Sequence, residues 1–202
     1  MQAVEKKIVA KIYGRGRGWA FSKIDFGADF DEANIHKALA SLAKAGRIRR
    51  ILRGIYDYPR VSEALGGSLF PDMDQVAQAL ARKFSWRIQP TGSAALNLMG
   101  LSTQVPGRWV YLSDGPARTY TLGKQDLEFR RAPLREAGFK LRESGLLVQA
   151  IRALGKGRLD ERTMVALRTA MQGKNCGRIV RETKAVPEWI HAVIRSVCQN
   201  SE

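Results

Sequence analysis

An amphipathic helix followed directly by a basic hairpin is the feature that most constrains the fold of this chain. Residues 31–45 begin with Asp31, which is suited to cap a helix, and they carry apolar residues at helical spacing on one face. Residues 47–59 combine β-branched and aromatic side chains with arginines around an Arg53-Gly54 turn, as expected of a hairpin. The apolar positions of the predicted helix, which must face the core, are Ile35, Leu39 and Leu42.

Two further helices are predicted before residue 31. Val4, Ile8 and Ile12 recur at helical spacing, which predicts a first helix at the start of the chain. Ser22 is suited to cap a short second helix over residues 22–26. The order helix, helix, turn, helix and basic hairpin is that of a winged helix-turn-helix, which lays one helix in the major groove of DNA and sets the hairpin on the flanking backbone.

The charge balance points to a polyanionic partner. The chain has 34 Lys and Arg against 19 Asp and Glu, a formal net charge of +15 and a pI near 10.3. Double-stranded DNA is the expected partner, ahead of an anionic membrane. No apolar run is long enough to span a membrane and the start of the chain does not read as a signal peptide, so a cytoplasmic protein is predicted. With two cysteines and two histidines, no metal, disulfide or other cofactor is predicted.

The residues predicted to contact DNA are polar or basic and fall on three elements. On the outer face of the third helix, Asn34 and Lys37 are predicted to reach base edges, because their side chains pair with adenine and guanine. The other predicted contacts, assigned mainly to phosphates, are Arg15, Arg17, Ser22, Ser41, Lys44, Arg47, Arg49, Arg50 and Arg53.

Three alternative readings apply to these residues. A polar helix face of this kind is also typical of a helix that is simply solvated. One of the arginines is alternatively expected to pair with an acidic residue nearby: Asp25, Asp29, Asp31 or Asp57. For His36 a neutral, partly exposed side chain is expected in place of a DNA contact.

The chain is predicted to be an α+β protein of two domains. Glycines and Pro71 over residues 65–71 predict a boundary between a winged helix-turn-helix domain, residues 1–62, and a second domain, residues 70–202. The second domain is predicted to be mixed α/β, with a small antiparallel sheet and a helical C-terminus. Its predicted strands are residues 108–112, 118–122 and 126–131.

One motif in the second domain is compatible with an enzyme. Thr91-Gly92-Ser93 follows an extended segment and precedes a helix, as in a nucleotidyltransferase, where such a turn holds phosphates beside a pair of magnesium-binding aspartates. That acidic pair is missing downstream, because Asp114 reads as a turn residue. Ser93 also lacks the glycine-flanked elbow of a serine hydrolase. The chain is therefore predicted not to be an enzyme, and a nucleotidyltransferase-like enzyme acting on nucleic acid is kept as the alternative.

Taken together, the motifs resemble those of the AbiEi-type antitoxins, bacterial proteins of type IV toxin-antitoxin (abortive infection) systems that act in phage defence. The resemblance covers residues 1–135 well and the helical end more loosely. The matching residues are Gly14-x-Gly16, Phe21-Ser22, Ala38-Leu39-x-x-Leu42-x-x-x-Gly46-x-Ile48-x-Arg50, Arg53-Gly54-Ile55-Tyr56-x-x-Pro59, Thr91-Gly92-Ser93-Ala94-Ala95-Leu96-Asn97-Leu98-Met99-Gly100-Leu101 and Gln104-Val105-Pro106.

The resemblance implies a DNA-binding antitoxin that is also the transcriptional autorepressor of its operon. The N-terminal domain would bind inverted repeats in the operon's own promoter, with DNA contacts on residues 31–45 and 47–53. The C-terminal domain would counter a partner toxin that is a nucleotidyltransferase. A stand-alone winged-helix regulator without a toxin and a nonspecific basic accessory protein remain alternatives. The charge of +6 over residues 140–202 is compatible with a longer DNA footprint, with an acidic toxin or with RNA.

Overall fold

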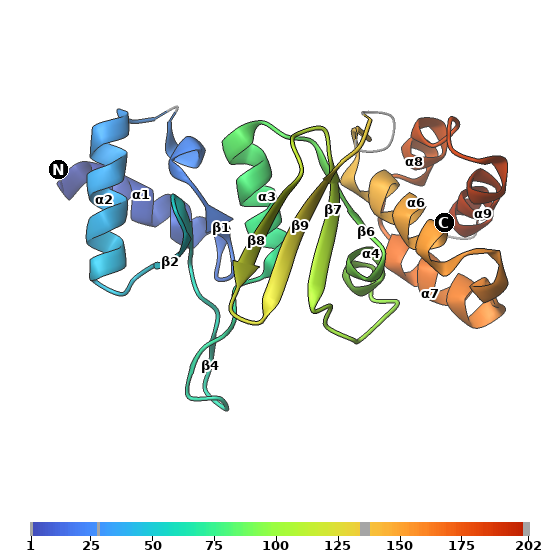
Figure 1. Ribbon diagram of the computed structural model, residues 1–202, viewed down its shortest axis with the longest axis horizontal. Coiled ribbons are helices and arrows are strands. Elements are labelled where there is room, and N and C mark those ends of the chain that lie inside the picture. The colour runs from blue at the N-terminus through green and yellow to red at the C-terminus, as the bar shows by residue number, and fades with distance from the viewer. Residues whose placement is uncertain (1, 28, 134–137, 200–202) are drawn as a thin grey trace. The chain divides into compact units, whose positions relative to one another are not determined.

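The computed structural model describes residues 2–27, 29–133 and 138–199. The protein is a mixture of helices and small sheets, as predicted, and the chain divides into two compact units, Met1–Trp86 and Arg87–Glu202 (Figure 1). In the three described ranges, no helix combines the length and the apolar character needed to cross a membrane.

The first unit begins with two helices, a 3-10 turn and a three-stranded antiparallel sheet of order β1-β3-β2. The helix over residues 31–45 and the hairpin about Arg53-Gly54 are confirmed, and Asp31 is the predicted N-cap. The predicted second helix is a 3-10 helix, η1, because only four residues separate Ser22 from Gly27. The elements are α1 (Gln2–Arg15), β1 (Ala20–Phe21), η1 (Lys23–Phe26), α2 (Glu32–Lys44), β2 (Arg49–Leu52) and β3 (Ile55–Asp57).

The predicted apolar stripes of the first unit meet in one core. Ile8 and Ile12 of α1 pack with Ile35 and Leu39 of α2, and all four are buried. Phe21 joins them from β1, so the sheet is anchored to both helices. Burial of these side chains fixes which face of α2 is turned outward.

The boundary between the two units falls later than the predicted one. Helix α3 (Met73–Phe84), capped by Asp72, packs on β1, β3 and η1 and so belongs to the first unit. Arg82 fastens it there, since its guanidinium donates to the Ala20 carbonyl at 2.8 Å and to the Asp25 carboxylate at 2.6 Å. The glycine-rich stretch predicted as a linker forms the small hairpin of β4 (Val61–Ser62) and β5 (Gly67–Ser68).

The second unit contains a four-stranded sheet of order β6-β7-β9-β8. An antiparallel sheet was predicted, but the observed sheet is mixed. β7 and β9 lie side by side in parallel register, whereas β6-β7 and β8-β9 are antiparallel. Four residues connect β7 to β8, which is more than a tight hairpin turn needs. After β8 the chain turns at Gly123-Lys124, and β9 pairs with both β8 and β7, so that it lies between these two strands. The elements are β6 (Ile88–Thr91), α4 (Ser93–Leu98), β7 (Arg108–Ser113), β8 (Arg118–Leu122) and β9 (Gln125–Arg131).

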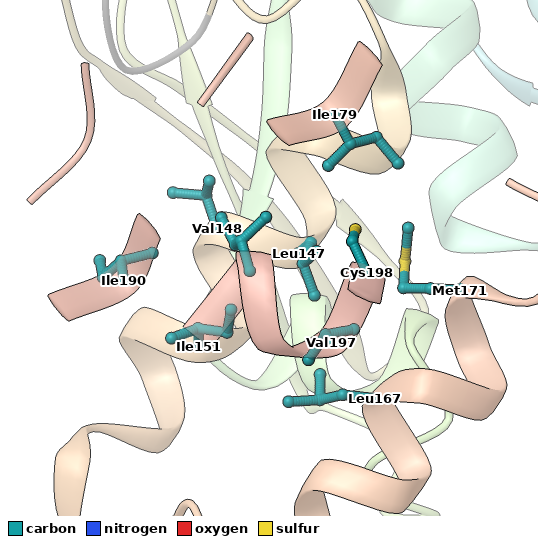
Figure 2. Packing of buried hydrophobic residues seen from close by; sticks show 10 residues of the cluster. Leu147, Val148, Ile151, Leu167, Met171, Ile179, Ile190, Val197 and Cys198 are labelled. Atoms are coloured by element: carbon teal, nitrogen blue, oxygen red, sulfur yellow. The ribbon is translucent and has the colours of Figure 1, made fainter. Parts of the chain in front are cut away.

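The helical C-terminus closes over a separate apolar core (Figure 2). Leu147 and Ile151 face Leu167, Ile179 and Val197, so residues from four helices share this core. α6 lies against β6 and α4, which joins the helical part to the sheet. The elements are α6 (Arg142–Leu154), η2 (Lys156–Arg158), α7 (Glu161–Met171), α8 (Cys176–Glu182) and α9 (Glu188–Gln199).

Candidate functional site

The outward face of α2 is polar and cationic. Because Ile35, Leu39 and Leu42 are buried, the opposite side of the helix is left to solvent. Lys37, Ser41 and Lys44 are exposed there, as predicted. Within the described part of the chain, no hydrogen bond or ion pair occupies these three side chains.

Asn34 lies in the first turn of α2, where its side chain is engaged in capping. Its backbone N–H donates to Asp31 Oδ1 at 3.0 Å, and its side-chain amide donates to Asp31 Oδ2. The backbone bond from Asn34 is the largest influence that lowers the pKa of Asp31, and the side-chain bond adds to it. This capping bond uses one of the two N–H groups of the Asn34 amide, so the side chain is less free to turn toward a base than that of Lys37.

Arg49 has a structural role within the first unit, beside the phosphate contact predicted for it. Its Nε and Nη2 donate to the two carboxylate oxygens of Asp57 at 3.1 and 2.6 Å, and the Asp57 side chain is only 2% exposed. Its Nη1 donates to the Leu69 carbonyl at 2.9 Å. The alternative that one arginine pairs with an aspartate is thus realised at this position, because a buried carboxylate needs a partner.

The β2–β3 hairpin presents one arginine on β2, another at its tip and a neighbouring lysine. Arg50 and Arg53 are exposed. Lys83, from the last turn of α3, donates to the Arg53 carbonyl at 2.9 Å. Its burial, followed by the nearby charges of Arg53 and Lys23, lowers the pKa of Lys83, so cationic groups gather at this tip.

Two of the predicted arginines stack on tyrosines to form what we call the arginine–tyrosine ladder: Arg47, Tyr13, Tyr58 and Arg17. The rings of Tyr13 and Tyr58 stack with centroids 4.9 Å apart. The guanidinium carbon of Arg47 lies 5.7 Å from the Tyr13 ring centroid, and that of Arg17 lies 4.5 Å from the Tyr58 centroid. These cation–π contacts hold both guanidinium groups on the surface of the unit.

Hydrogen bonds fix the two ends of the ladder. Arg47 Nε and Nη2 donate to the Tyr13 hydroxyl at 3.3 and 3.1 Å, and Arg17 Nη1 donates to the Pro59 carbonyl at 2.8 Å. Each guanidinium keeps further N–H groups, since arginine has five donors. The ladder joins the end of α1 to the segment after α2 and the segment after β3.

The remaining two predicted contacts differ in their exposure. Arg15, the last residue of α1, is exposed and its guanidinium lies 5.7 Å from the Trp19 ring centroid. Ser22 is 0% exposed, so it does not belong to any surface, and its prediction as a DNA contact is wrong. Its predicted capping position is confirmed, because Ser22 is the N-cap of η1.

Sequence reasoning missed Tyr13, Tyr58 and Lys83. Tyr13 follows Ile12 and so stands outside the apolar stripe of α1, a position that predicts exposure, and its side chain is 44% exposed. The sequence around Tyr58 gave no comparable signal for a surface contact, because apolar and polar residues alternate there as in any strand. Lys83 was assigned to another domain with the rest of α3.

The Thr91-Gly92-Ser93 motif lies between β6 and α4, as its spacing predicted, with Gly92 at a φ of +57°. The acidic residue that follows the motif in the sequence has a structural partner, since Asp114 accepts the Arg87 backbone N–H at 2.8 Å. Among the residues described, no group of three or more His, Cys, Asp or Glu is arranged to hold a metal ion.

Three comparisons place the chain among known proteins. No curated protein matches it. Among solved structures, it is similar to the crystal structure of the RV2827C protein from Mycobacterium tuberculosis, with 14% sequence identity, a TM-score of 0.41, and coverage of 98% of this chain and 77% of that chain. A family described as "Family of unknown function (DUF6088)" matches residues 7–179. Since this match spans most of the sequence, the chain belongs to the DUF6088 family.

Proposed function

We propose that the first unit is a winged helix-turn-helix that binds double-stranded DNA, and that the protein is a sequence-specific transcriptional repressor. In this proposal α2 enters the major groove, and the β2–β3 hairpin is the wing that lies on the flanking backbone.

The observation that carries the proposal is the exposed cationic face of α2, which has no partner among the described residues, next in sequence to a hairpin with exposed arginines. The element order helix, strand, short helix, helix, hairpin supports it, as does the sheet order β1-β3-β2, which binds the wing to the helical core through β1. The excess of basic residues favours a polyanionic partner.

The contacts of each residue suggest its role on DNA. Lys37 is the first candidate for a base contact, because its ammonium is exposed and has no partner among the described residues, whereas the Asn34 amide is engaged by Asp31. Lys44, Arg50 and Arg53 are candidates for phosphates, since they are exposed and cationic.

The arginine–tyrosine ladder and Arg15 extend the proposed phosphate-binding surface. Guanidinium groups held against aromatic rings lose less conformational freedom on binding than free side chains do. Their remaining N–H groups are suited to phosphate oxygens.

Selection from a random duplex library by the full-length protein, at about 150 mM salt to suppress nonspecific binding, tests this proposal. We expect an enriched sequence motif. Lys37→Ala should relax preference at one position of the motif at a cost of about 1 to 3 kcal/mol, whereas Arg53→Ala should weaken all duplexes about equally.

Arg162→Ala is the matched control, because Arg162 is an exposed arginine of α7 in the second unit. It should leave both the motif and the affinity unchanged. Failure to enrich any motif would reject sequence-specific binding, and equal losses on motif and random duplexes for Lys37→Ala would reject α2 as the recognition helix.

The resemblance to AbiEi-type antitoxins extends the proposal to a biological role. In this role the DNA site consists of inverted repeats in the promoter of the protein's own operon, and the partner is a nucleotidyltransferase toxin acting in the same cytoplasm. Expression of the adjacent gene with and without this chain tests it: growth arrest should occur only without the chain. If the adjacent gene does not arrest growth when expressed alone, the antitoxin role is rejected and the protein is a regulator without a toxin.

A further inference from the structure

The second unit contains a hollow of about 990 Å³ with a cationic rim. α6 and α8 form two of its walls, and the segments before α6 and before α9 form the others. This volume is in the range of sites that bind small organic molecules. The hollow belongs entirely to the second unit and includes none of the residues assigned to DNA.

Four basic residues and one acidic residue line the hollow, and the acidic one is already engaged. Glu182 accepts from the Leu141 backbone N–H and from the Ser144 hydroxyl, each at 3.0 Å, and pairs with Arg178 at 3.3 Å. These bonds hold the pKa of Glu182 below its usual value despite its partial burial, so the carboxylate stays ionised and occupied. The net positive charge of the rim favours an anion.

Arg181 is the rim residue best placed to take up that anion. It is exposed on α8, and no hydrogen bond or ion pair within the described residues holds its guanidinium. A guanidinium with free N–H groups binds phosphate oxygens in a bidentate manner.

The rest of the wall is apolar and suits a ring. Phe139, Val186 and Pro187 line the hollow beside the basic rim. A bare phosphate would leave this apolar surface without contacts. A ligand that combines a ring system with phosphates would use both features.

We propose that this hollow binds a nucleoside phosphate, with the phosphates on Arg181 and Lys140 and the base against Phe139.

Calorimetric titration of the full-length protein at about 150 mM salt, which screens exposed charges, tests the proposal. The probes are ADP, GDP, CDP, UDP and inorganic pyrophosphate. At least one nucleoside diphosphate should bind about tenfold or more tightly than pyrophosphate, and Arg181→Ala should weaken it by about tenfold or more. Arg162→Ala, the same change outside the hollow, should leave the affinity unchanged.

Binding of no probe at millimolar concentration, equal affinity for pyrophosphate and all nucleotides, or equal losses in the Arg181 and Arg162 variants would each overturn the proposal. These outcomes are independent of DNA binding by the first unit.

Discussion

Arg49 donates two N–H groups to the two carboxylate oxygens of Asp57, and this pair ties neighbouring strands of the first unit together. Asp57 is almost fully buried, whereas about a third of the Arg49 side chain is exposed. Arg49 also reaches the Leu69 carbonyl, so it links the sheet to the segment before α3. Its role is therefore to satisfy a buried carboxylate and to fasten this segment.

Arg49→Ala should lower the free energy of unfolding by about 2 to 3 kcal/mol, because it leaves the Asp57 carboxylate buried without its partner. Urea unfolding followed by circular dichroism measures this change. Arg50→Ala, the neighbouring exposed arginine, is the control and should shift stability by less than about 0.5 kcal/mol. Equal effects of the two substitutions would refute the structural role of Arg49.

Gly54 should tolerate alanine poorly. Its φ is +74°, and a Cβ there would lie 3.1 Å from Lys83 Nζ. Gly54→Ala should cost about 1 to 2 kcal/mol, since an L-residue is strained at positive φ. Gly14→Ala, in α1 with open space around it, should stabilise the protein by about 0.5 to 1 kcal/mol. Thermal unfolding distinguishes them, and a neutral Gly54→Ala would contradict the turn geometry.

The stack of Tyr13 on Tyr58 should be measurable as a coupling energy. A double-mutant cycle of Tyr13→Ala and Tyr58→Ala should give about 1 kcal/mol, as for other stacked aromatic pairs. A cycle that pairs Tyr13→Ala with Tyr120→Ala, in the other unit, should give additive losses. Additivity within the ladder itself would show that the two rings do not support each other.

Much of the first unit follows from the sequence because its elements have strong local signals. The apolar stripe of α2, its Asp31 cap and the Arg53-Gly54 turn predicted a helix and a hairpin at the observed places. These features depend on residues within one element, which sequence periodicity reports directly.

The features that the sequence did not predict are interactions between distant residues. Nothing local distinguishes Arg49, which pairs with the buried Asp57, from the exposed Arg50 beside it. Packing of α3 on the first unit likewise depends on a tertiary contact, that of Arg82 with Asp25. The parallel pairing of β7 with β9 depends on where the β8 hairpin returns, which strand patterns do not specify.

Salt dependence should separate phosphate contacts from structural arginines. If Arg53 contacts a phosphate, Arg53→Ala should flatten the slope of log K against log salt by about 0.9, because one fewer counterion is released on binding. Arg162→Ala should leave the slope unchanged, and fluorescence anisotropy over a salt series with one duplex measures both. A slope unaltered by Arg53→Ala would remove the hairpin tip from the proposed interface.

The two cysteines should differ sharply in reactivity. Burial, and then the neighbouring Cys176, raise the pKa of Cys198 to about 12. An unfolded thiol titrates near pH 8.5, so the protonated Cys198 supports the fold fully below about pH 8.5 and this contribution is lost as the pH rises toward 12. Iodoacetamide at pH 8 should therefore modify the partly exposed Cys176 well before Cys198, whereas both should react in urea. Mass spectrometry of tryptic peptides distinguishes the sites, and equal labelling of the folded protein would contradict the burial of Cys198 in the α9 core.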